Sequence, residues 1–473
     1  MKKIIGREWE QKVLAEAVDS ERPEFVAVYG RRRIGKTYLV RNFFHGEFDF
    51  YMSGSFNAPM KDQLENFHFQ LESYSGRVWP KAASWNEAFG QLRVYLASLK
   101  KDKIIVFIDE LPWLDTPKSR FISALELFWN GWGDWNDRMK FIVCGSATTW
   151  MTHKLIGNKG GLHNRVTRQL YLAPFNLRET EMMLDWVGVK WNRHQIVECY
   201  MAVGGVPFYL SKMSKGLSLS QNIDRLFFHD KAELKLEYQT LFRSLFKDSE
   251  IYRQVVELLA TKARGMTRSD IRKALDKPES GKLTEVLNNL MTCDFIREYT
   301  AFGKKKRGNL FQLTDLYILF YLKQVKGVNN LTGDYWSTRI DSPSHRAWSG
   351  YAFEQVCLHH IRQIKEALGV AGIQSAVYSW TQEEHGKSKA QIDLVIDRRD
   401  EVINLCEMKF SLSAFNITGA YLKEMLERVE LFRETTKTRK ALHLTMVTMN
   451  GVVHNEQWSM IQNEVTADDL FRS

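Results

Sequence analysis

Eight residues near the start of the chain combine glycines, a lysine and a hydroxyl at a spacing that suits phosphate binding. They fit the pattern GxxxxGK[ST] and lie between an apolar run, FVAVYG, and a helical pattern. Glycines let backbone N–H groups turn toward an anion, and the start of a helix adds a favourable partial charge. The loop, with Tyr38 directly after it, consists of Gly30, Arg31, Arg32, Arg33, Ile34, Gly35, Lys36 and Thr37.

Two side chains of this loop have distinct predicted roles. Lys36 is expected to reach the β- and γ-phosphates of a nucleotide, and the Thr37 hydroxyl is expected to ligate Mg²⁺. The arginines at 31–33 are predicted to lie on the exterior of the loop, either solvated or facing a neighbouring subunit. No guanine-specific NKxD motif occurs in the chain, so ATP with Mg²⁺ is favoured over GTP.

A second acidic site follows the apolar run IIVFIDE, which reads as a buried strand. Asp109 at its end is placed to hold Mg²⁺ through water, and Glu110 could polarise an attacking water as general base. An apolar run that ends in Asp-Glu is by itself usually a strand meeting its loop. The phosphate loop upstream favours the functional interpretation, and the two parts together predict ATP hydrolysis.

These motifs resemble the AAA+-related archaeal ATPase group of P-loop proteins, relatives of the STAND signalling ATPases. The resemblance spans nearly the whole chain and rests on the segments IIGREWEQKVL, VYGRRRIGKTYLV, VFIDELPWL, FIVCGSATTWM, GLHNRVTRQLYLAPF and VGGVPFYL. It implies that Gly6, Arg7 and Glu8 lie beside the adenine. It also implies that Ser146 lies nearest the γ-phosphate.

The same resemblance implies an arginine finger at Arg165, although His163 and Asn164 replace the usual tyrosine and glycine before it. Arg168 is the alternative, and a solvated basic loop would explain both arginines equally well. Pro207 of the GGxP turn is expected near the base, or else simply breaks a helix. No sensor-2 arginine is found, which favours a STAND-like switch over a ring motor.

The composition is that of a globular protein with several domains, since 473 residues exceed one ordinary domain. The formal charge of +10 permits contact with nucleic acid without requiring it. Five separated cysteines with no CxxC suggest neither zinc nor disulfides. The start MKKIIGREWEQ has no signal-peptide core, and the longest apolar run, LYILFYL, is too short to span a membrane. A cytoplasmic location without membrane contact is expected.

The patterning predicts an α/β chain in four parts. Residues 1–170 read as a P-loop ATPase core with a parallel sheet, and residues 171–248 read as a helical lid. Residues 249–325 read as a winged helix-turn-helix. Residues 345–473 return to α/β. The aromatic cluster LFWNGWGDWNDRM is predicted to pack against the ATPase sheet.

The winged-helix interpretation rests on two short amphipathic helices followed by a hairpin with a basic tip. Lys282, Asn288 and Asn289 are predicted on the polar face of the second helix, and the hairpin tip at 304–307 carries three lysines and an arginine suited to phosphate contact. The resemblance places a winged helix here too. Winged helices also serve protein contact and intramolecular docking, so both alternatives stay open.

The C-terminal part resembles the family's domain of unknown function, which looks like a PD-(D/E)xK restriction-endonuclease-like fold. The resemblance implies that Asp393 and Glu407 ligate a divalent metal, with Lys409 orienting water and Glu354 as an accessory acid. The tripeptide ExK is common, but Glu407 ends an apolar strand and Asp393 lies in the strand before it. Strand-end carboxylates exposed to water are the structural alternative.

Three functions fit these residues. The first is an ATP-hydrolysing switch that acts on DNA through the winged helix and the nuclease-like domain. The second is a metal-dependent DNA nuclease licensed by ATP. The third is a STAND-like scaffold that self-associates with ATP and recruits a protein partner without touching DNA.

Overall fold

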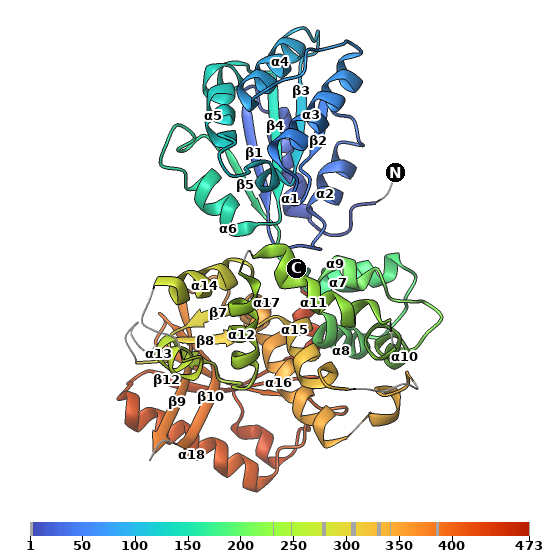
Figure 1. Ribbon diagram of the computed structural model, residues 1–473. Coiled ribbons are helices and arrows are strands. Elements are labelled where there is room, and N and C mark those ends of the chain that lie inside the picture. The colour runs from blue at the N-terminus through green and yellow to red at the C-terminus, as the bar shows by residue number, and fades with distance from the viewer. Residues whose placement is uncertain are drawn as a thin grey trace. The chain divides into compact units, whose positions relative to one another are not determined.

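The computed structural model describes residues 3–229, 231–246, 248–276, 281–303, 309–328, 333–340, 342–384 and 387–472. The chain divides into two compact units, Met1–Ala173 and Pro174–Ser473 (Figure 1). The first unit includes residues 171–173, which the sequence analysis assigned to the helical lid, because the last strand of its sheet runs to Tyr171.

The first unit contains a five-stranded sheet in which every neighbouring pair is parallel. In sheet order the strands are β2 (Phe50–Ser53), β3 (Ile104–Asp109), β4 (Met139–Gly145), β1 (Glu24–Tyr29) and β5 (Arg168–Tyr171). The predicted parallel α/β core is confirmed. Because β4 lies between β1 and β3, the carboxyl ends of these three strands meet at one edge of the sheet.

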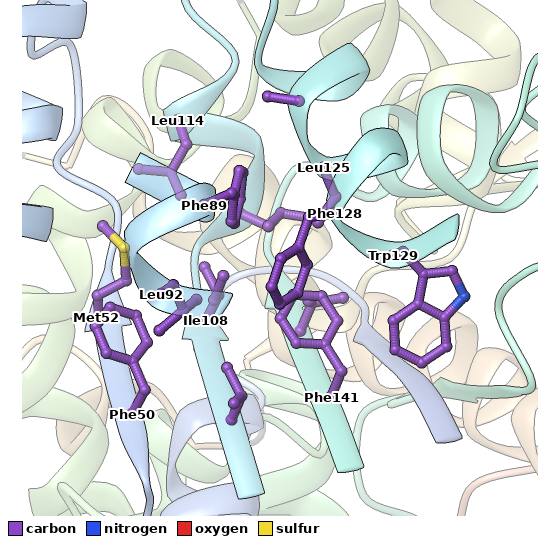
Figure 2. Packing of buried hydrophobic residues seen from close by; sticks show 14 of the residues in the cluster. Phe50, Met52, Phe89, Leu92, Ile108, Leu114, Leu125, Phe128, Trp129 and Phe141 are labelled. Carbon is purple, nitrogen blue, oxygen red and sulfur yellow. The ribbon is translucent and has the colours of Figure 1, made fainter. Parts of the chain in front are cut away.

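Helices cover both faces of this sheet, which explains why its strands read as continuous apolar runs. Phe25 and Ala27 of β1 face a core formed with α3 (Met60–Ser75), α4 (Trp85–Ala97) and α5 (Phe121–Gly131), part of which Figure 2 shows. Val26 and Val28 point the other way, toward α1 (Glu8–Asp19) and α2 (Lys36–Phe43). The alternation along β1 thus divides the core into two layers.

The aromatic cluster at the end of α5 is split between core and surface. Trp129 is fully buried, 4.8 Å from the ring of Phe25, and Phe128 packs beside it against Phe141 (Figure 2). The prediction of packing against the sheet is confirmed for these two residues. It is wrong for Trp135, which is 83% exposed because it lies in the short turn η2 (Gly133–Trp135) rather than on the helix.

The second unit begins with helices and ends with a mixed sheet (Figure 1). Its helices before the small sheet are α7 (Leu177–Trp186), α8 (Arg193–Val203), α9 (Pro207–Leu210), α10 (Leu219–Ile223), η4 (Asp224–Phe228), α11 (Glu233–Leu245) and α12 (Ser249–Ala260). The small antiparallel sheet has the order β6 (Met266–Thr267), β8 (Leu310–Leu313), β7 (Ile296–Tyr299), and α13 (Arg268–Ala274) and α14 (Gly281–Thr292) connect β6 to β7.

The final part of this unit joins further helices to a second five-stranded sheet. The helices are α15 (Leu316–Phe320), η6 (Tyr321–Val325), η7 (Ser337–Arg339), α16 (Pro343–His359), α17 (Ile361–Ala367) and α18 (Gly419–Thr436). The sheet order is β13 (Asn463–Thr466), β12 (Ala441–Thr448), β11 (Val402–Lys409), β10 (Lys387–Arg398), β9 (Ser375–Glu384). Within the described ranges, no helix combines the length and apolar character needed to span a membrane.

A buried histidine joins two helices of the second unit. His360, 1% exposed, accepts a hydrogen bond at Nε2 from the backbone N–H of Leu177 at 3.0 Å, and its Nδ1 lies 2.7 Å from the Val356 carbonyl oxygen. These contacts require a neutral ring with its proton on Nδ1, because a protonated Nε2 cannot accept. Burial lowers the pKa of His360 from 6.5 to about 4, although the hydrogen bond to Val356 opposes this effect.

We therefore expect His360 to destabilise the second unit in mild acid, while Glu354, whose pKa is raised to about 8, acts in the opposite direction over the same window. The unfolded chain takes up a proton at His360 near pH 6.5, whereas the folded chain resists protonation until about pH 4. The stability that His360 contributes is fully present above pH 6.5, and about 3 kcal/mol of this contribution is lost as the pH falls through the window. Urea unfolding between pH 7 and pH 4.5 measures the loss. His360→Gln, which keeps an acceptor for Leu177 and leaves Glu354 in place, should lose less stability than the wild type between pH 7 and pH 4.5, and an equal change in both proteins would refute this account.

Candidate nucleotide-binding site

The predicted phosphate loop connects β1 to α2, and its backbone is shaped by glycines. Gly30 and Gly35 have φ values of 143° and 87°, in the region that favours glycine. A Cβ on Gly30 would lie 2.4 Å from the Leu172 carbonyl oxygen and 2.6 Å from Cδ1 of Ile34. The loop thus needs glycine at this position, and its N–H groups can turn toward an anion at the start of α2.

Lys36 is the first residue of α2, and its side chain folds back over the loop. Its Nζ donates to the carbonyl oxygens of Gly30 at 3.0 Å and Arg31 at 2.9 Å, and the residue is only 5% exposed. A phosphate oxygen is a stronger acceptor for an ammonium group than a neutral carbonyl. The arrangement therefore holds a positive charge where the phosphates of a nucleotide would enter the loop.

Thr37 and Asp109 meet although they are far apart in the sequence. The Thr37 hydroxyl donates to Oδ2 of Asp109 at 2.8 Å, which brings the start of α2 to the carboxyl end of β3. A hydroxyl and a carboxylate oxygen are hard donors of the type that Mg²⁺ prefers. The residues present therefore fit the predicted magnesium ion of a bound nucleotide.

Cys144 of β4 completes the surroundings of Asp109, a role that the sequence analysis missed. Its buried thiol donates to Oδ1 of Asp109, and the backbone N–H of Glu110 donates to the same oxygen at 2.9 Å. Burial, followed by the Asp109 charge, raises the pKa of Cys144 well above its usual value, so the thiol stays protonated. Cys144 lies near the end of the strand next to the one that ends in Asp109. This position was the signal in the sequence that could have identified the contact.

Glu110 and Ser146 form a second pair at the same sheet edge. Oε2 of Glu110 accepts hydrogen bonds from the backbone N–H of Ser146 at 3.0 Å and from its hydroxyl at 2.8 Å. Glu110 adopts a left-handed backbone conformation with φ 46°, which is uncommon for a residue with a side chain. The ends of β3 and β4 thus hold the predicted base against the predicted sensor residue.

The loop arginines differ from the expectation that they lie on the exterior. Arg31 is only 1% exposed, so the prediction is wrong for this residue, whereas Arg32 and Arg33 are half-buried. Arg33 has φ 76°, a left-handed conformation in the middle of the loop. Burial of Arg31 follows from the packing of the surrounding segments, which the local pattern does not reveal.

Three further residues were predicted to contact the nucleotide, and they lie in different parts of the structure. Arg7 is 6% exposed and donates to the Ala173 carbonyl oxygen at 2.6 Å, with Glu10 at 3.1 Å. Tyr38 is on α2 and donates to the Lys3 carbonyl oxygen at 3.1 Å. Pro207 starts α9 and belongs to the second unit, so its relation to the phosphate loop stays a prediction.

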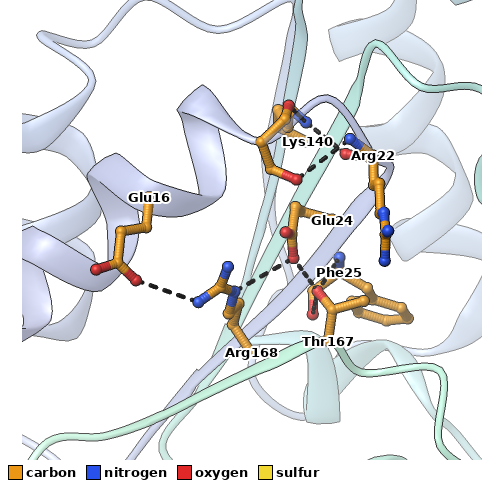
Figure 3. A network of polar contacts seen from close by, with 8 residues as sticks. Glu16, Arg22, Glu24, Phe25, Lys140, Thr167 and Arg168 are labelled. Atoms are coloured by element: carbon orange, nitrogen blue, oxygen red, sulfur yellow. Dashed lines mark hydrogen bonds and ion pairs between the residues drawn. The ribbon is translucent and has the colours of Figure 1, made fainter.

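Both predicted finger arginines lie toward the amino edge of the sheet. Arg168 starts β5, pairs with Val26 in the register, and contacts Glu16 at 3.3 Å and Glu24 at 3.5 Å (Figure 3). Val26 lies four positions before Gly30, the first residue of the loop, which corresponds to about 13 Å along the strand. Arg165 is paired with Asp134 at 2.7 Å, just before the amino end of β4. Neither arginine therefore lies at the carboxyl edge where the phosphate loop of its own chain is found, and the finger assignment stays a prediction.

The four predicted nuclease residues come together in the second unit. Glu354 lies on α16, Asp393 on β10, and Glu407 and Lys409 at the end of β11. Burial, followed by the charge of Asp393, raises the pKa of Glu354 to about 8. Burial, followed by the charge of Glu407, also raises the pKa of Asp393. The carboxylates come together as expected, although they lie on the neighbouring interior strands β10 and β11 and on α16 rather than at an edge of the sheet.

The partners of Glu407 do not fit a bound divalent metal. Its Oε1 accepts from the Tyr421 hydroxyl at 2.6 Å and lies 2.9 Å from Lys409 Nζ, while Oε2 lies 2.9 Å from Arg428 NH1. The described parts of the chain contain no group of three or more His, Cys, Asp or Glu residues spaced for a metal ion. Tyr421 and Arg428 were missed, although their spacing of seven on one helix places them on the same face.

The predicted recognition helix and wing differ in part from the expectation. Asn289 was expected on the polar face, but it is 8% exposed and donates to the Tyr252 hydroxyl at 2.7 Å, so this assignment is wrong. Lys282 and Asn288 are exposed, with Lys282 at 2.8 Å from Asp248. The basic tip, Lys304, Lys305, Lys306 and Arg307, lies outside the described residues.

The described part of the β7–β8 hairpin contacts the C-terminal sheet of the same unit. Phe302 donates its backbone N–H to the Ser379 carbonyl oxygen at 2.7 Å, and Ala301 forms a parallel bridge with Ser379. The Phe302 ring lies 5.3 Å from Tyr378 and 5.1 Å from Phe432. Intramolecular docking, one of the alternatives for this hairpin, is therefore observed.

Comparisons with known proteins find a family that matches the first unit and the start of the second. Residues 4–213 match the model of a family described as an ATPase domain predominantly from Archaea. An uncharacterized protein of Methanocaldococcus jannaschii is 26% identical over 368 residues, covering 77% of this chain and 78% of that protein.

Two solved structures of archaeal proteins are also similar. A Walker-type ATPase of Pyrococcus abyssi is 18% identical with a TM-score of 0.48, over 67% of this chain and 96% of that one. The ORC2 protein of Aeropyrum pernix, solved as ADPNP and ADP complexes, is 14% identical with a TM-score of 0.43, over 72% and 96%.

The family match covers the phosphate loop, the acids Asp109 and Glu110 at the end of β3, and the end of β4, where the geometry brings the predicted residues together. The predicted nucleotide binding and ATP hydrolysis are thereby confirmed at the level of the family. Residues 4–213 are thus similar to the ATPase domain of this predominantly archaeal family, and the chain is a P-loop enzyme that hydrolyses ATP.

Proposed function

We propose that this protein is a molecular switch in which the hydrolysis of Mg²⁺-bound ATP controls binding to DNA. The observation that carries the ATPase half of the proposal is the meeting of Thr37 with Asp109 at 2.8 Å at the edge where Glu110 contacts Ser146. These pairs lie at the ends of neighbouring parallel strands, directly beside the loop that holds Lys36.

Each side chain then has a defined task in hydrolysis. The backbone N–H groups of the loop and Lys36 bind the phosphates and offset the negative charge that spreads over the γ-phosphoryl oxygens. Glu110 accepts the proton of the attacking water. Thr37 and Asp109 would hold the Mg²⁺ ion, which supplies charge neutralisation between the β- and γ-phosphates when bound.

The contact between Ser146 and Glu110 supplies a means of sensing the nucleotide. The γ-phosphate offers Ser146 a charged acceptor that competes with Glu110 for the same hydroxyl proton. Loss of the γ-phosphate would return Ser146 to Glu110, so the end of β4 would differ between the ATP and ADP states. Arg165 would complete this site only from a second copy, which favours self-association during turnover.

The DNA half of the proposal rests on charge and on α14. The chain has a formal charge of +10. On α14, the side chains of Lys282 and Asn288 are exposed, and Lys282 lies at the exposed start of this helix. An exposed lysine at a helix start is suited to a phosphate contact, because the helix dipole adds to its charge. Among the described residues of this winged-helix-like segment, α14 presents exposed polar side chains suited to a duplex.

DNA cleavage is a second candidate, favoured by the convergence of Glu354, Asp393 and Glu407 beside Lys409. This would make the last domain a PD-(D/E)xK-like nuclease. Lys409, Arg428 and Tyr421 contact both oxygens of the Glu407 carboxylate, so this arrangement does not fit a metal ion. We therefore assign no cleavage step to it.

Fluorescence anisotropy with a labelled DNA duplex at low salt tests the proposal. We expect the affinity of the full chain for DNA to differ by about tenfold between ATP and ADP. Lys36→Ala should remove this difference, and Lys282→Ala with Asn288→Ala should weaken binding without changing ATP turnover. ATP turnover without DNA binding in any nucleotide state would refute the switch and favour the protein-recruiting scaffold.

The same samples distinguish the nuclease candidate. Plasmid DNA with Mn²⁺ and ATP should stay intact if the protein is a switch alone. Cleavage by the wild type that disappears in Asp393→Asn would establish the nuclease, because this substitution removes a charge and preserves the shape of the side chain.

A further inference from the structure

The second unit contains a pocket of about 150 Å³ that plays no part in the proposed ATPase or DNA functions. It lies between α8, α10 and the segment from η7 to α16. Trp336, Trp348 and His345 form an aromatic wall, Leu219 and Ile223 add an apolar wall, and Glu198 of α8 contributes a carboxylate. A cavity of this volume accommodates one aromatic ring.

The aromatic wall is held firmly in place. The rings of Trp336 and Trp348 are 5.3 Å apart at 82°, and His345 lies 4.9 Å from Trp336. Asp224, only 4% exposed, accepts hydrogen bonds from the backbone N–H groups of Trp336 at 2.7 Å and Ser337 at 3.0 Å. A buried carboxylate anchors this wall to η4, so the pocket is preformed and a ligand need not order it.

The charge of the pocket indicates the kind of ligand. Glu198 is 22% exposed, and the ionisable partner found for it among the described residues is His194, with Nδ1 at 3.6 Å on the same helix. The indole Nε1 of Trp348 is buried and has no hydrogen-bond partner among the described residues, and Trp348 lines the pocket. Two indole rings and a carboxylate attract a cation, through the ring quadrupoles and through the charge.

We propose that this pocket binds a small organic cation, an amine attached to a body of about one ring. The apolar body would lie against Trp336, Trp348, Leu219 and Ile223, and the ammonium group would pair with Glu198. An anion would be repelled by Glu198, and a neutral ring would gain the apolar contacts without the ion pair. The ligand class is therefore set by a single carboxylate in an aromatic pocket.

Ligand-observed NMR titration of the full chain with benzylamine and benzyl alcohol tests the proposal, because the two probes share a ring and differ in charge. We expect benzylamine to bind the wild type at least about tenfold more tightly than benzyl alcohol, consistent with one partly buried ion pair and cation–π contact. Glu198→Gln should bring the two affinities to within about twofold of each other.

Glu181→Gln is the matched control, because Glu181 is 29% exposed and pairs with Arg193 of α8 but does not line the pocket. It should leave the preference for benzylamine unchanged. Trp348→Leu, which removes part of the wall, should weaken both probes. Equal binding of the two probes by the wild type, no saturable binding of benzylamine, or an unchanged preference in Glu198→Gln would each overturn the proposal.

Discussion

Replacement of Glu110 by glutamine is expected to lower the rate of ATP hydrolysis by about two to four orders of magnitude. Glutamine preserves the length of the side chain and can still accept a hydrogen bond from Ser146, but it cannot take a proton from water. The phosphate loop and Lys36 are unchanged, so ATP should still bind. The variant should therefore hold ATP and fail to turn it over.

Single-turnover phosphate release and equilibrium binding of ATP separate these two effects. The expected result is a large fall in the rate of release with a dissociation constant close to that of the wild type. Glu126→Gln, a carboxylate on α5 of the same unit, is the control and should hydrolyse ATP normally. Wild-type turnover in Glu110→Gln would show that another group activates the water.

Replacement of Lys36 by alanine should weaken the binding of ATP itself. Its Nζ lies 3.0 Å and 2.9 Å from two carbonyl oxygens of the loop, positioned to donate to phosphate oxygens. Charge-assisted hydrogen bonds of this kind contribute about 1.5–3 kcal/mol. The dissociation constant should therefore rise by about 10- to 150-fold.

Titration with a fluorescent ATP analogue measures this change. Lys61→Ala is the matched control, because Lys61 is an exposed lysine on α3 of the same unit. It should bind the nucleotide as the wild type does. If Lys36→Ala bound the analogue equally well, the loop would not be the phosphate site, and the assignment of the nucleotide to this sheet edge would be lost.

The parts of the site that could be predicted from the sequence are those set by local geometry. Gly30 and Gly35 take positive φ values that few other residues tolerate, and the strand before them and the helix after them were evident from the pattern. The meeting of Thr37 with Asp109 also followed, because parallel strands bring their carboxyl ends to the same edge.

The features that were missed depend on contacts between distant segments. Arg31 is buried and Cys144 donates to Asp109, and neither fact can be read from the residues on either side of them. Trp135 belongs to the same aromatic cluster as Trp129 but points to solvent, because the helix ends between them. Short patterns predict elements well and predict the direction of single side chains poorly.

In the second unit the sequence predicted which residues converge but not what they contact. Asp393 and Glu407 came together as expected, yet Arg428 and Tyr421 of α18 occupy the Glu407 carboxylate. Likewise Phe302, an apolar residue just before a basic tip, packs on Tyr378 and Phe432. An apolar side chain beside a cluster of lysines was the signal that this hairpin has a protein contact.

The most direct test of the account is the release of phosphate from ATP by the full chain at saturating nucleotide, with Lys36→Ala and Glu110→Gln measured beside it. The account predicts steady release by the wild type, at a rate at least about 100-fold above both variants. Equal release by all three proteins, or none by the wild type with DNA present or absent, would contradict the claim that β1, β3 and β4 build the site of hydrolysis.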